Sequence, residues 1–170
     1  MVYLKYFQRV FMVSLKRCCF AGHNETYGDE VKEKIKEIAI KLIEEKGVVE
    51  FWVGNYGGFD RCAASAIGAV KKVYPHIKLV LILPYLTKTV SDYKEEYYEK
   101  YDEIVIADIP EKTPARLKII KANEYMVDNC DFMICNVEHS WGGAAKTVEY
   151  AKNKNKAIYN LMEGGISCFS

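Results

Sequence analysis

The chain has 170 residues, of which 50% are hydrophobic and 28% are charged, and its formal net charge is +1. This length is that of one ordinary domain, and the composition is that of a globular protein and not of a disordered one. The near-zero charge excludes a general electrostatic attraction to nucleic acid. The longest apolar run, "LVLILPYL" at 79–86, is far shorter than the about 20 residues that cross a bilayer, so we expect no membrane span.

The first fifteen residues do not resemble a secretion signal. Lys5, Gln8 and Arg9 interrupt the apolar positions, and no small-residue cleavage site follows them. We therefore expect residues 1–15 to form an N-terminal extension, within which Met12 offers an alternative start.

Six cysteines raise the question of disulfides or of a metal site. Cys18 and Cys19 are adjacent, and no C-x-x-C pair occurs. Paired spacing is what structural zinc sites and disulfide frameworks require. We expect free thiols in a reducing cytoplasm, with no metal and no other cofactor.

From residue 16 onward, short apolar runs alternate with segments of helical period. The runs are continuously apolar, as in strands that are buried on both faces of a sheet. We expect strands at 17–22, 49–54, 78–83, 104–108, 132–137 and 157–161. Between them the period predicts helices at 29–47, 63–73, 116–129 and 143–152, and a surface helix at 90–103 with Tyr93, Tyr97 and Tyr101 on one side.

Repeated alternation of strand and helix predicts an α/β fold. We expect a single Rossmann-like domain at 16–162, with a mainly parallel sheet of five or six strands and helices on both faces. A C-terminal tail would follow at 163–170. The tyrosine helix is expected to pack on the sheet; the alternative is a lid or a partner surface, which would suit a homo-oligomer.

Unusual residues collect where the expected strands end, and ligands bind outside the carboxyl ends of the strands in an open parallel sheet. Gly22 and His23 follow the first strand, "GNYGGFD" at 54–60 follows the second, and "EHSWGG" at 138–143 follows the fifth. Two of these loops put glycines at the start of a helix, where free N–H groups and the helix dipole favour phosphate. The alternative is a tight turn with Asp60 as the helix cap.

Several side chains in these loops suit a nucleotide. Trp141 and Tyr56 can stack on a base, or else pack at the sheet edge. His23 can donate to a phosphate or exchange a proton with a substrate. Glu138 and Glu149 can support cleavage of a glycosidic bond, although Glu149 lies about two helical turns beyond the glycine pair.

Four segments together carry a family resemblance: "CCFAGH" at 18–23, "GNYGGFD", "EYMVDNCDFMI" at 124–134 and "SWGGAAKTVEYAK" at 140–152. Over 16–162 the chain resembles the SLOG superfamily, the Rossmann-like group that includes the lonely-guy phosphoribohydrolases and the DNA-processing protein Smf. The match is closest to the small bacterial members related to YpsA. The resemblance implies a pocket for a nucleotide or nucleotide derivative. Loops and resemblance together mark these candidate ligand-binding residues: Gly22, His23, Gly54, Asn55, Tyr56, Gly57, Gly58, Asp60, Arg116, Ser140, Trp141, Gly142, Gly143 and Thr147.

The chain departs from the lonely-guy pattern at the second glycine pair. "WGGAAKTVE" lacks the proline and the third glycine of those enzymes, and its threonine is displaced by one position. Related small members often carry an arginine-rich helix, where this chain has only Arg116, Lys118 and Lys121. We therefore expect a nucleotide sensor or sequestering protein. The first alternative is a nucleoside-monophosphate phosphoribohydrolase with Glu149 and Glu138 as catalytic residues; the second, disfavoured by the charge, is a DNA-processing accessory like Smf.

Overall fold

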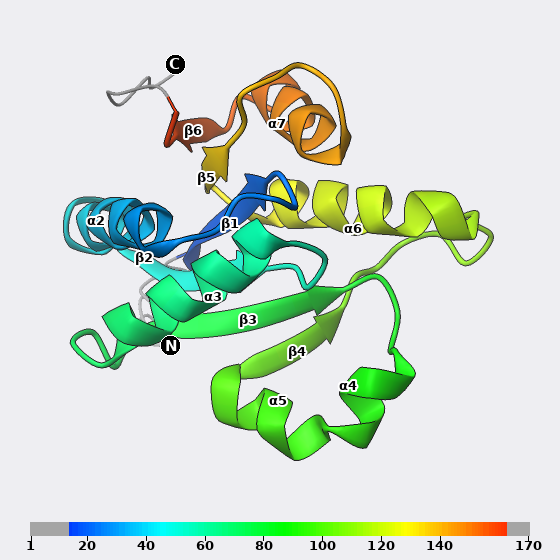
Figure 1. Ribbon diagram of the computed structural model, residues 1–170, viewed down its shortest axis with the longest axis horizontal. Helices are drawn as coiled ribbons and strands as arrows, with labels where there is room; N and C mark the ends of the chain where they lie inside the picture. The colour runs from blue at the N-terminus through cyan, green and yellow to red at the C-terminus, as the bar shows by residue number, and fades with distance from the viewer. Residues whose placement is uncertain (1–13, 163–170) are drawn as a thin grey trace, which may run out of the picture.

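The computed structural model describes residues 14–162. The expected C-terminal tail, and all but the last two residues of the expected N-terminal extension, lie outside this range. Within it, six parallel strands form one sheet in the order β4-β3-β2-β1-β5-β6 (Figure 1). The strands are β1 (Lys16–Gly22), β2 (Val48–Val53), β3 (Lys78–Leu83), β4 (Glu103–Ile106), β5 (Phe132–Asn136) and β6 (Ala157–Asn160).

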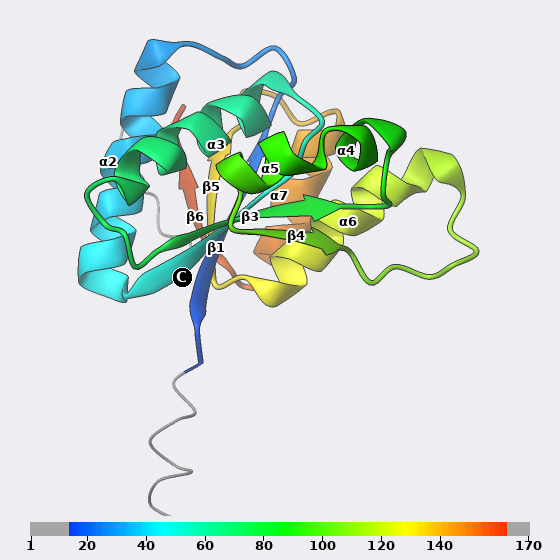
Figure 2. The ribbon, with the colours of Figure 1, turned by 90° about the horizontal axis from the view of Figure 1, so that it is seen from below.

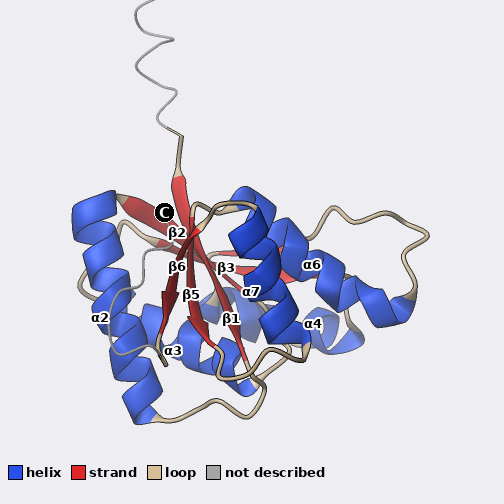
Figure 3. Cartoon of the chain, turned by 90° about the horizontal axis from the view of Figure 1, so that it is seen from above, coloured by secondary structure: helices blue, strands red, loops and turns tan. Residues whose placement is uncertain are grey.

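Helices cover both faces of the sheet, as Figures 2 and 3 show. One face is covered by α2 (Asp29–Lys46) and α3 (Gly58–Lys71), with the short helices α4 (Lys88–Asp92) and α5 (Lys94–Lys100) beside them. The other face is covered by α6 (Ala115–Asn129) and α7 (Gly143–Asn153). The predicted Rossmann-like α/β fold is confirmed. None of the helices in this part of the chain is long and apolar enough to cross a membrane.

The apolar pattern of α2 explains how this helix docks. Ile35, Ala39, Leu42 and Ile43 recur at helical spacing and are all buried in the core between α2, α3 and the sheet. Gly47 then ends the helix in the left-handed conformation, with a φ of 71°. Glycine adopts this conformation without steric penalty, so the chain can turn directly into β2.

The tyrosine segment differs from the single helix that its spacing predicts. It forms α4 and α5, which meet at Tyr93, where φ is −109° and ψ is 36°. Tyr101 lies beyond the end of α5 in extended backbone, because the chain turns there into β4, and its ring is buried. Tyr97 is half-buried and stacks with Tyr101 at 6.1 Å between ring centroids. The stripe therefore contributes to the core mainly through its last two rings.

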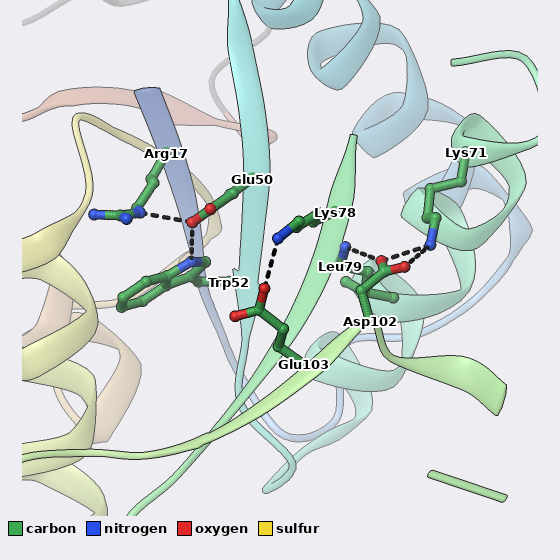
Figure 4. Close-up of polar contacts among 8 residues, drawn as sticks. All are labelled: Arg17, Glu50, Trp52, Lys71, Lys78, Leu79, Asp102 and Glu103. Carbon is green, nitrogen blue, oxygen red and sulfur yellow. Dashed lines mark hydrogen bonds and ion pairs between the residues drawn. The ribbon is translucent and has the colours of Figure 1, made fainter. Parts of the chain in front are cut away.

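A polar cluster holds β1 and β2 together near their amino ends (Figure 4). Glu50 is only 8% exposed. It accepts hydrogen bonds from Arg17 Nε at 2.6 Å and from Trp52 Nε1 at 3.1 Å. The Arg17 guanidinium also lies over the Trp52 ring at 5.0 Å. This buried carboxylate is thus paired with a charge and a second donor, as burial of an ion requires.

Two further ion pairs lie beside β3 in the same view (Figure 4). Lys78 Nζ contacts Glu103 Oε1 at 2.6 Å across β3 and β4. Asp102 accepts from Lys71 Nζ at 2.5 Å and from the backbone N–H of Leu79 at 2.7 Å. Burial raises the pKa of Asp102, but these donors outweigh it, so the pKa lies below its ordinary value. These charges lie toward the amino ends of the strands and leave the carboxyl ends to other residues.

The order of the strands reverses beside β1. From β1 the chain builds the sheet outward through β2, β3 and β4, and then returns to place β5 on the other side of β1. At such a switch point the connections leave β1 and β5 toward opposite faces, which opens a crevice at their carboxyl ends.

Candidate functional site

A cavity of about 230 Å³ occupies this crevice, and we call it the switch-point cavity. The end of β1 forms its floor, the first residues of α3 and α7 form two walls, and α6 forms a third. Its lining residues are Phe20, Ala21, Gly22, His23, Asn24, Tyr56, Gly57, Asp60, Ile119, Asn123, Gly143, Ala144 and Thr147. Seven of the fourteen predicted ligand-binding residues therefore meet here: Gly22, His23, Tyr56, Gly57, Asp60, Gly143 and Thr147.

The start of α7 is bare toward the cavity. Gly142, at the N-cap position, has a φ of 92°, and no side chain caps the helix. A Cβ added to Gly143 would meet no atom within 4 Å, so the backbone here borders open space. The first N–H groups of a helix have no partner inside it and carry the positive end of the dipole. This end of the cavity is suited to an anion.

Thr147 and Asn123 brace this wall. The Thr147 side chain, 5% exposed, donates to the Gly143 carbonyl at 2.9 Å and accepts from Asn123 Nδ2 at 3.3 Å. The bond from Asn123 to Thr147 joins α6 to α7, and the bond from Thr147 to Gly143 holds the first turn of α7. The sequence did not lead us to predict Asn123 as a site residue. The available signal was a polar residue four positions after Ile119 on the same helix.

The opposite wall carries a carboxylate. Asp60 Oδ2 accepts a hydrogen bond from the backbone N–H of Tyr56 at 3.0 Å. Burial raises the pKa of Asp60, and the Tyr56 N–H and the Arg61 guanidinium only partly oppose this effect. Neither lysine nor arginine lines the cavity within residues 14–162. The cavity thus has a donor end at α7 and an acceptor end at Asp60.

The glycines of "GNYGGFD" contact protein more than open space. A Cβ on Gly58 would overlap the Asn24 carbonyl oxygen, and one on Gly54 would lie 2.8 Å from Asp60 Oδ2. Gly57 borders the cavity, yet its Cβ would lie 3.2 Å from Asn24 Cα. Gly57 and Gly58 let the loop after β2 approach the loop after β1, and Gly54 makes room for Asp60, whereas Gly143 leaves its backbone open.

Three aromatic rings stack along the rim. The His23 and His139 ring centroids are 3.9 Å apart, and those of His139 and Trp141 are 3.7 Å apart with planes within 7°. His23 Nε2 accepts from the Glu138 N–H at 3.3 Å, and the backbone carbonyl of Trp141 accepts from His139 Nδ1 at 2.9 Å. Burial, and next the neighbouring His139, lower the pKa of His23 below its ordinary 6.5, so His23 is neutral at pH 7. Trp141 is 70% exposed at the end of this stack.

The remaining predicted residues lie outside the switch-point cavity. Asn55 Nδ2 donates to the Tyr97 hydroxyl at 3.3 Å. Arg116 is exposed in the first turn of α6, and Ser140 is exposed in the loop before α7. Gly54, Gly58, Trp141 and Gly142 are the other four outside it.

The two predicted catalytic glutamates are separated from each other. Glu138 is exposed and lines a neighbouring cavity with His139. Glu149 is exposed on α7 and lines a groove between α6 and α7 with Glu124 and Tyr150. Asp60 is the carboxylate that lines the switch-point cavity itself.

The topology and the crevice define an α/β protein of the Rossmann-like class, with a cavity at the switch point of a parallel sheet. The YspA SLOG family (YpsA) matches residues 17–163. The chain belongs to this family.

Relatives and solved structures agree with this assignment. The chain is 28% identical to UPF0398 protein BH1768 of Halalkalibacterium halodurans, over 79% of this chain and 74% of that protein. It is 26% identical to the SPbeta prophage-derived protein YoqJ of Bacillus subtilis, over 72% of this chain and 81% of that protein. DNA processing protein A of Streptococcus pneumoniae shares the fold with a TM-score of 0.63 and 13% identity, and that of Helicobacter pylori with 0.60 and 14%. These alignments cover 88% and 86% of this chain but only 53% and 65% of those two proteins.

Proposed function

We propose that this protein binds a nucleotide or nucleotide derivative in the switch-point cavity and acts as a sensor or sequestering protein. The observation that carries the proposal is the bare N-terminus of α7, which opens into the cavity at Gly143. A phosphate there would accept from backbone N–H groups and gain from the helix dipole. The absence of lysine and arginine from the lining within residues 14–162 makes these N–H groups the main anion donors.

The polarity of the cavity orients the rest of the ligand. With the phosphate at α7, a ribose would extend toward α3, where the Asp60 carboxylate can accept from sugar hydroxyls. Tyr56 lines the same wall and offers a ring for the base, and Trp141 offers a second ring farther out. In this orientation the phosphate faces the N–H donors of α7, and the sugar hydroxyls face the Asp60 acceptor.

Cleavage of an N-glycosidic bond is less well supported by the geometry. Glu149 is the residue expected to take the catalytic role of the lonely-guy enzymes. It lies in the groove between α6 and α7, outside the cavity. Glu138 lines the neighbouring cavity. An enzyme of this kind needs a carboxylate close to the scissile bond, so Asp60 is the residue to test if free base is formed.

The proposal is tested by proton NMR of the purified protein with AMP, GMP, CMP, NAD and cyclic ADP-ribose, followed over time. Broadening of one ligand's signals without free base would support a sensor or sequestering protein. A free base that grows with time would instead establish a hydrolase.

The matched variants are Gly143→Val and Gly68→Val. The added side chain at Gly143 would stand in the anion site, so we expect affinity to fall at least about tenfold, or roughly 1.4 kcal/mol. Gly68 lies on α3 with open space around its Cβ, outside the cavity lining, and its variant should bind normally. Equal affinity of the two variants would overturn the phosphate site. Binding of an oligothymidylate in place of every nucleotide would favour a single-stranded DNA partner, the kind of ligand that DNA processing protein A of Helicobacter pylori binds.

A further inference from the structure

The switch-point cavity is too small to enclose a whole nucleotide. Pockets that enclose a small-molecule ligand measure about 300–1,000 Å³. The switch-point cavity measures about 230 Å³, so part of the ligand lies outside it. A phosphate at the start of α7 and a ribose at Asp60 both lie inside the cavity, and the base is then the part that reaches the opening. The side chains at the opening therefore decide which base is bound.

Two large side chains flank this opening. Tyr56, in the loop after β2, and Ile119, on α6, both line the cavity, and each is 37% exposed. A side chain that borders the cavity and also reaches solvent stands where the two meet. Because α3 and α6 cover opposite faces of the sheet, Tyr56 and Ile119 approach the opening from opposite sides.

Tyr56 is held by its backbone and not by its hydroxyl. Its N–H donates to Asp60 Oδ2 at 3.0 Å, and Asp60 is the carboxylate that faces the ribose in the proposed binding mode. The Tyr56 hydroxyl makes no hydrogen bond within residues 14–162. The ring is thus fixed beside the ribose site, where the base of a nucleotide begins.

Aromatic surface continues beside Tyr56. Tyr85, in the loop after β3, is also exposed. Burial raises the pKa of Tyr56, and the neighbouring Tyr85 and Tyr97 hydroxyls raise it further, so these hydroxyls lie near one another. Lys118 Nζ lies 5.3 Å from the centre of the Tyr85 ring and joins this loop to α6 next to Ile119. The aromatic surface at the opening is therefore wider than one ring.

Trp141 is the other ring that a base could use, but its surroundings differ. It does not line the switch-point cavity, and His139 already covers one face of its ring at 3.7 Å. Trp141 follows β5 and Tyr56 follows β2, on opposite sides of β1 in the sheet. The Trp141 ring therefore belongs to a different part of the rim from the opening that Tyr56 and Ile119 flank.

From this arrangement we infer that the base lies between the Tyr56 ring and the Ile119 side chain, and that the ligand is a purine nucleotide. Contacts with the flat faces of a base grow with its area, so the double ring of a purine gains more than the single ring of a pyrimidine. This inference rests on the proposed function, because it takes the phosphate at α7 as given. It narrows the ligand from nucleotides in general to purine nucleotides, and it gives a role to Ile119, which the sequence did not mark.

The test measures the affinities of AMP, CMP and ribose 5-phosphate by isothermal titration calorimetry. Ribose 5-phosphate carries the two groups that enter the cavity and no base, so its affinity reports the phosphate and ribose sites alone. We expect AMP to bind at least about fivefold more tightly than ribose 5-phosphate, as stacking of one base on an aromatic side chain allows. CMP should have an affinity between those of the other two.

Variants at the opening locate the base. Tyr56→Leu and Ile119→Ala should each lower the ratio of AMP affinity to ribose 5-phosphate affinity at least about threefold. The matched controls Tyr98→Leu and Val73→Ala change exposed side chains outside the cavity lining and should preserve this ratio. A ratio that falls only in Trp141→Ala would place the base on the histidine stack and overturn the inference.

The outcomes separate this inference from the proposed function. Binding of ribose 5-phosphate, with a ratio that neither Tyr56→Leu nor Ile119→Ala changes, would overturn the inference and leave the phosphate site standing. Equal affinities for AMP and CMP would overturn the assignment to purines. Failure of every probe to bind would overturn the proposed function, and this inference with it.

Discussion

The backbone N–H of Gly58 donates to the backbone carbonyl of Asn24 at 2.8 Å, which ties the start of α3 to the loop after β1. The Asn24 side chain accepts from the same N–H at 3.2 Å. One N–H of the first turn of α3 thus donates to Asn24, although neither α3 nor α7 has a side-chain cap at its N-cap residue. The two glycine loops look alike in sequence but have different physical roles.

Gly58→Ala should therefore destabilise the protein, and Gly143→Ala should not. A methyl group on Gly58 would overlap the Asn24 carbonyl and lie 3.0 Å from that of Thr26, both of them backbone atoms. Forced repacking of this kind costs about 1–3 kcal/mol. At Gly143 the methyl meets open space, so the change should stay within about 0.5 kcal/mol. Urea unfolding curves measure both, and equal midpoints for the two variants would contradict this role of the loop after β2.

Thr147→Val should cost more stability than Thr147→Ser. Valine removes the hydroxyl that donates to Gly143 and leaves Asn123 Nδ2 without its acceptor. The loss of a hydrogen bond at this partly buried site costs about 0.5–1.5 kcal/mol, whereas serine keeps both bonds. The double variant with Asn123→Ala should lose less than the sum of the single variants, because the two side chains share one interaction. Strict additivity in urea unfolding would exclude coupling of α6 to α7 through this pair.

The histidine stack should make stability depend on pH. Because the folded pKa of His23 is below its ordinary 6.5, the unfolded chain binds a proton more readily than the folded one. The stabilisation from neutral His23 is therefore fully present above about pH 6.5 and is lost as the pH falls through the folded pKa. Proton NMR titration of the His23 ring should give a midpoint below 6.5.

Burial is the largest cause of the lowered pKa of His23, and the neighbouring His139 is the second, which the variant His139→Gln tests. It removes the neighbouring ring whose charge lowers the pKa of His23, so the His23 midpoint should rise. His23→Gln should flatten the dependence of the unfolding free energy on pH between 5 and 7.5. A His23 midpoint at or above 6.5 in the wild-type protein would rule out the neutral ring as a stabilising part of the stack.

The sequence by itself determined the fold of this protein. Continuous apolar runs predicted all six strands, because a strand buried on both faces has no polar side to alternate with. Helical spacing, acidic starts and Gly47 predicted α2, because these signals act within a few residues of each other. The predicted strands also indicated that glycines and aromatic residues gather at the carboxyl edge of the sheet, because parallel strands all end there.

Only the tertiary structure decided what those glycines do. Gly58 and Gly143 both begin helices, and local spacing does not distinguish them. The difference is a contact across 34 residues: Asn24 fills the space beside Gly58, while nothing fills the space beside Gly143. The tertiary structure likewise decided the hydrogen bonds of Asn123 and Asn136, because their partners lie 24 and 110 residues away along the chain. Such contacts depend on how the strand order reverses beside β1, and no short segment of sequence contains that information.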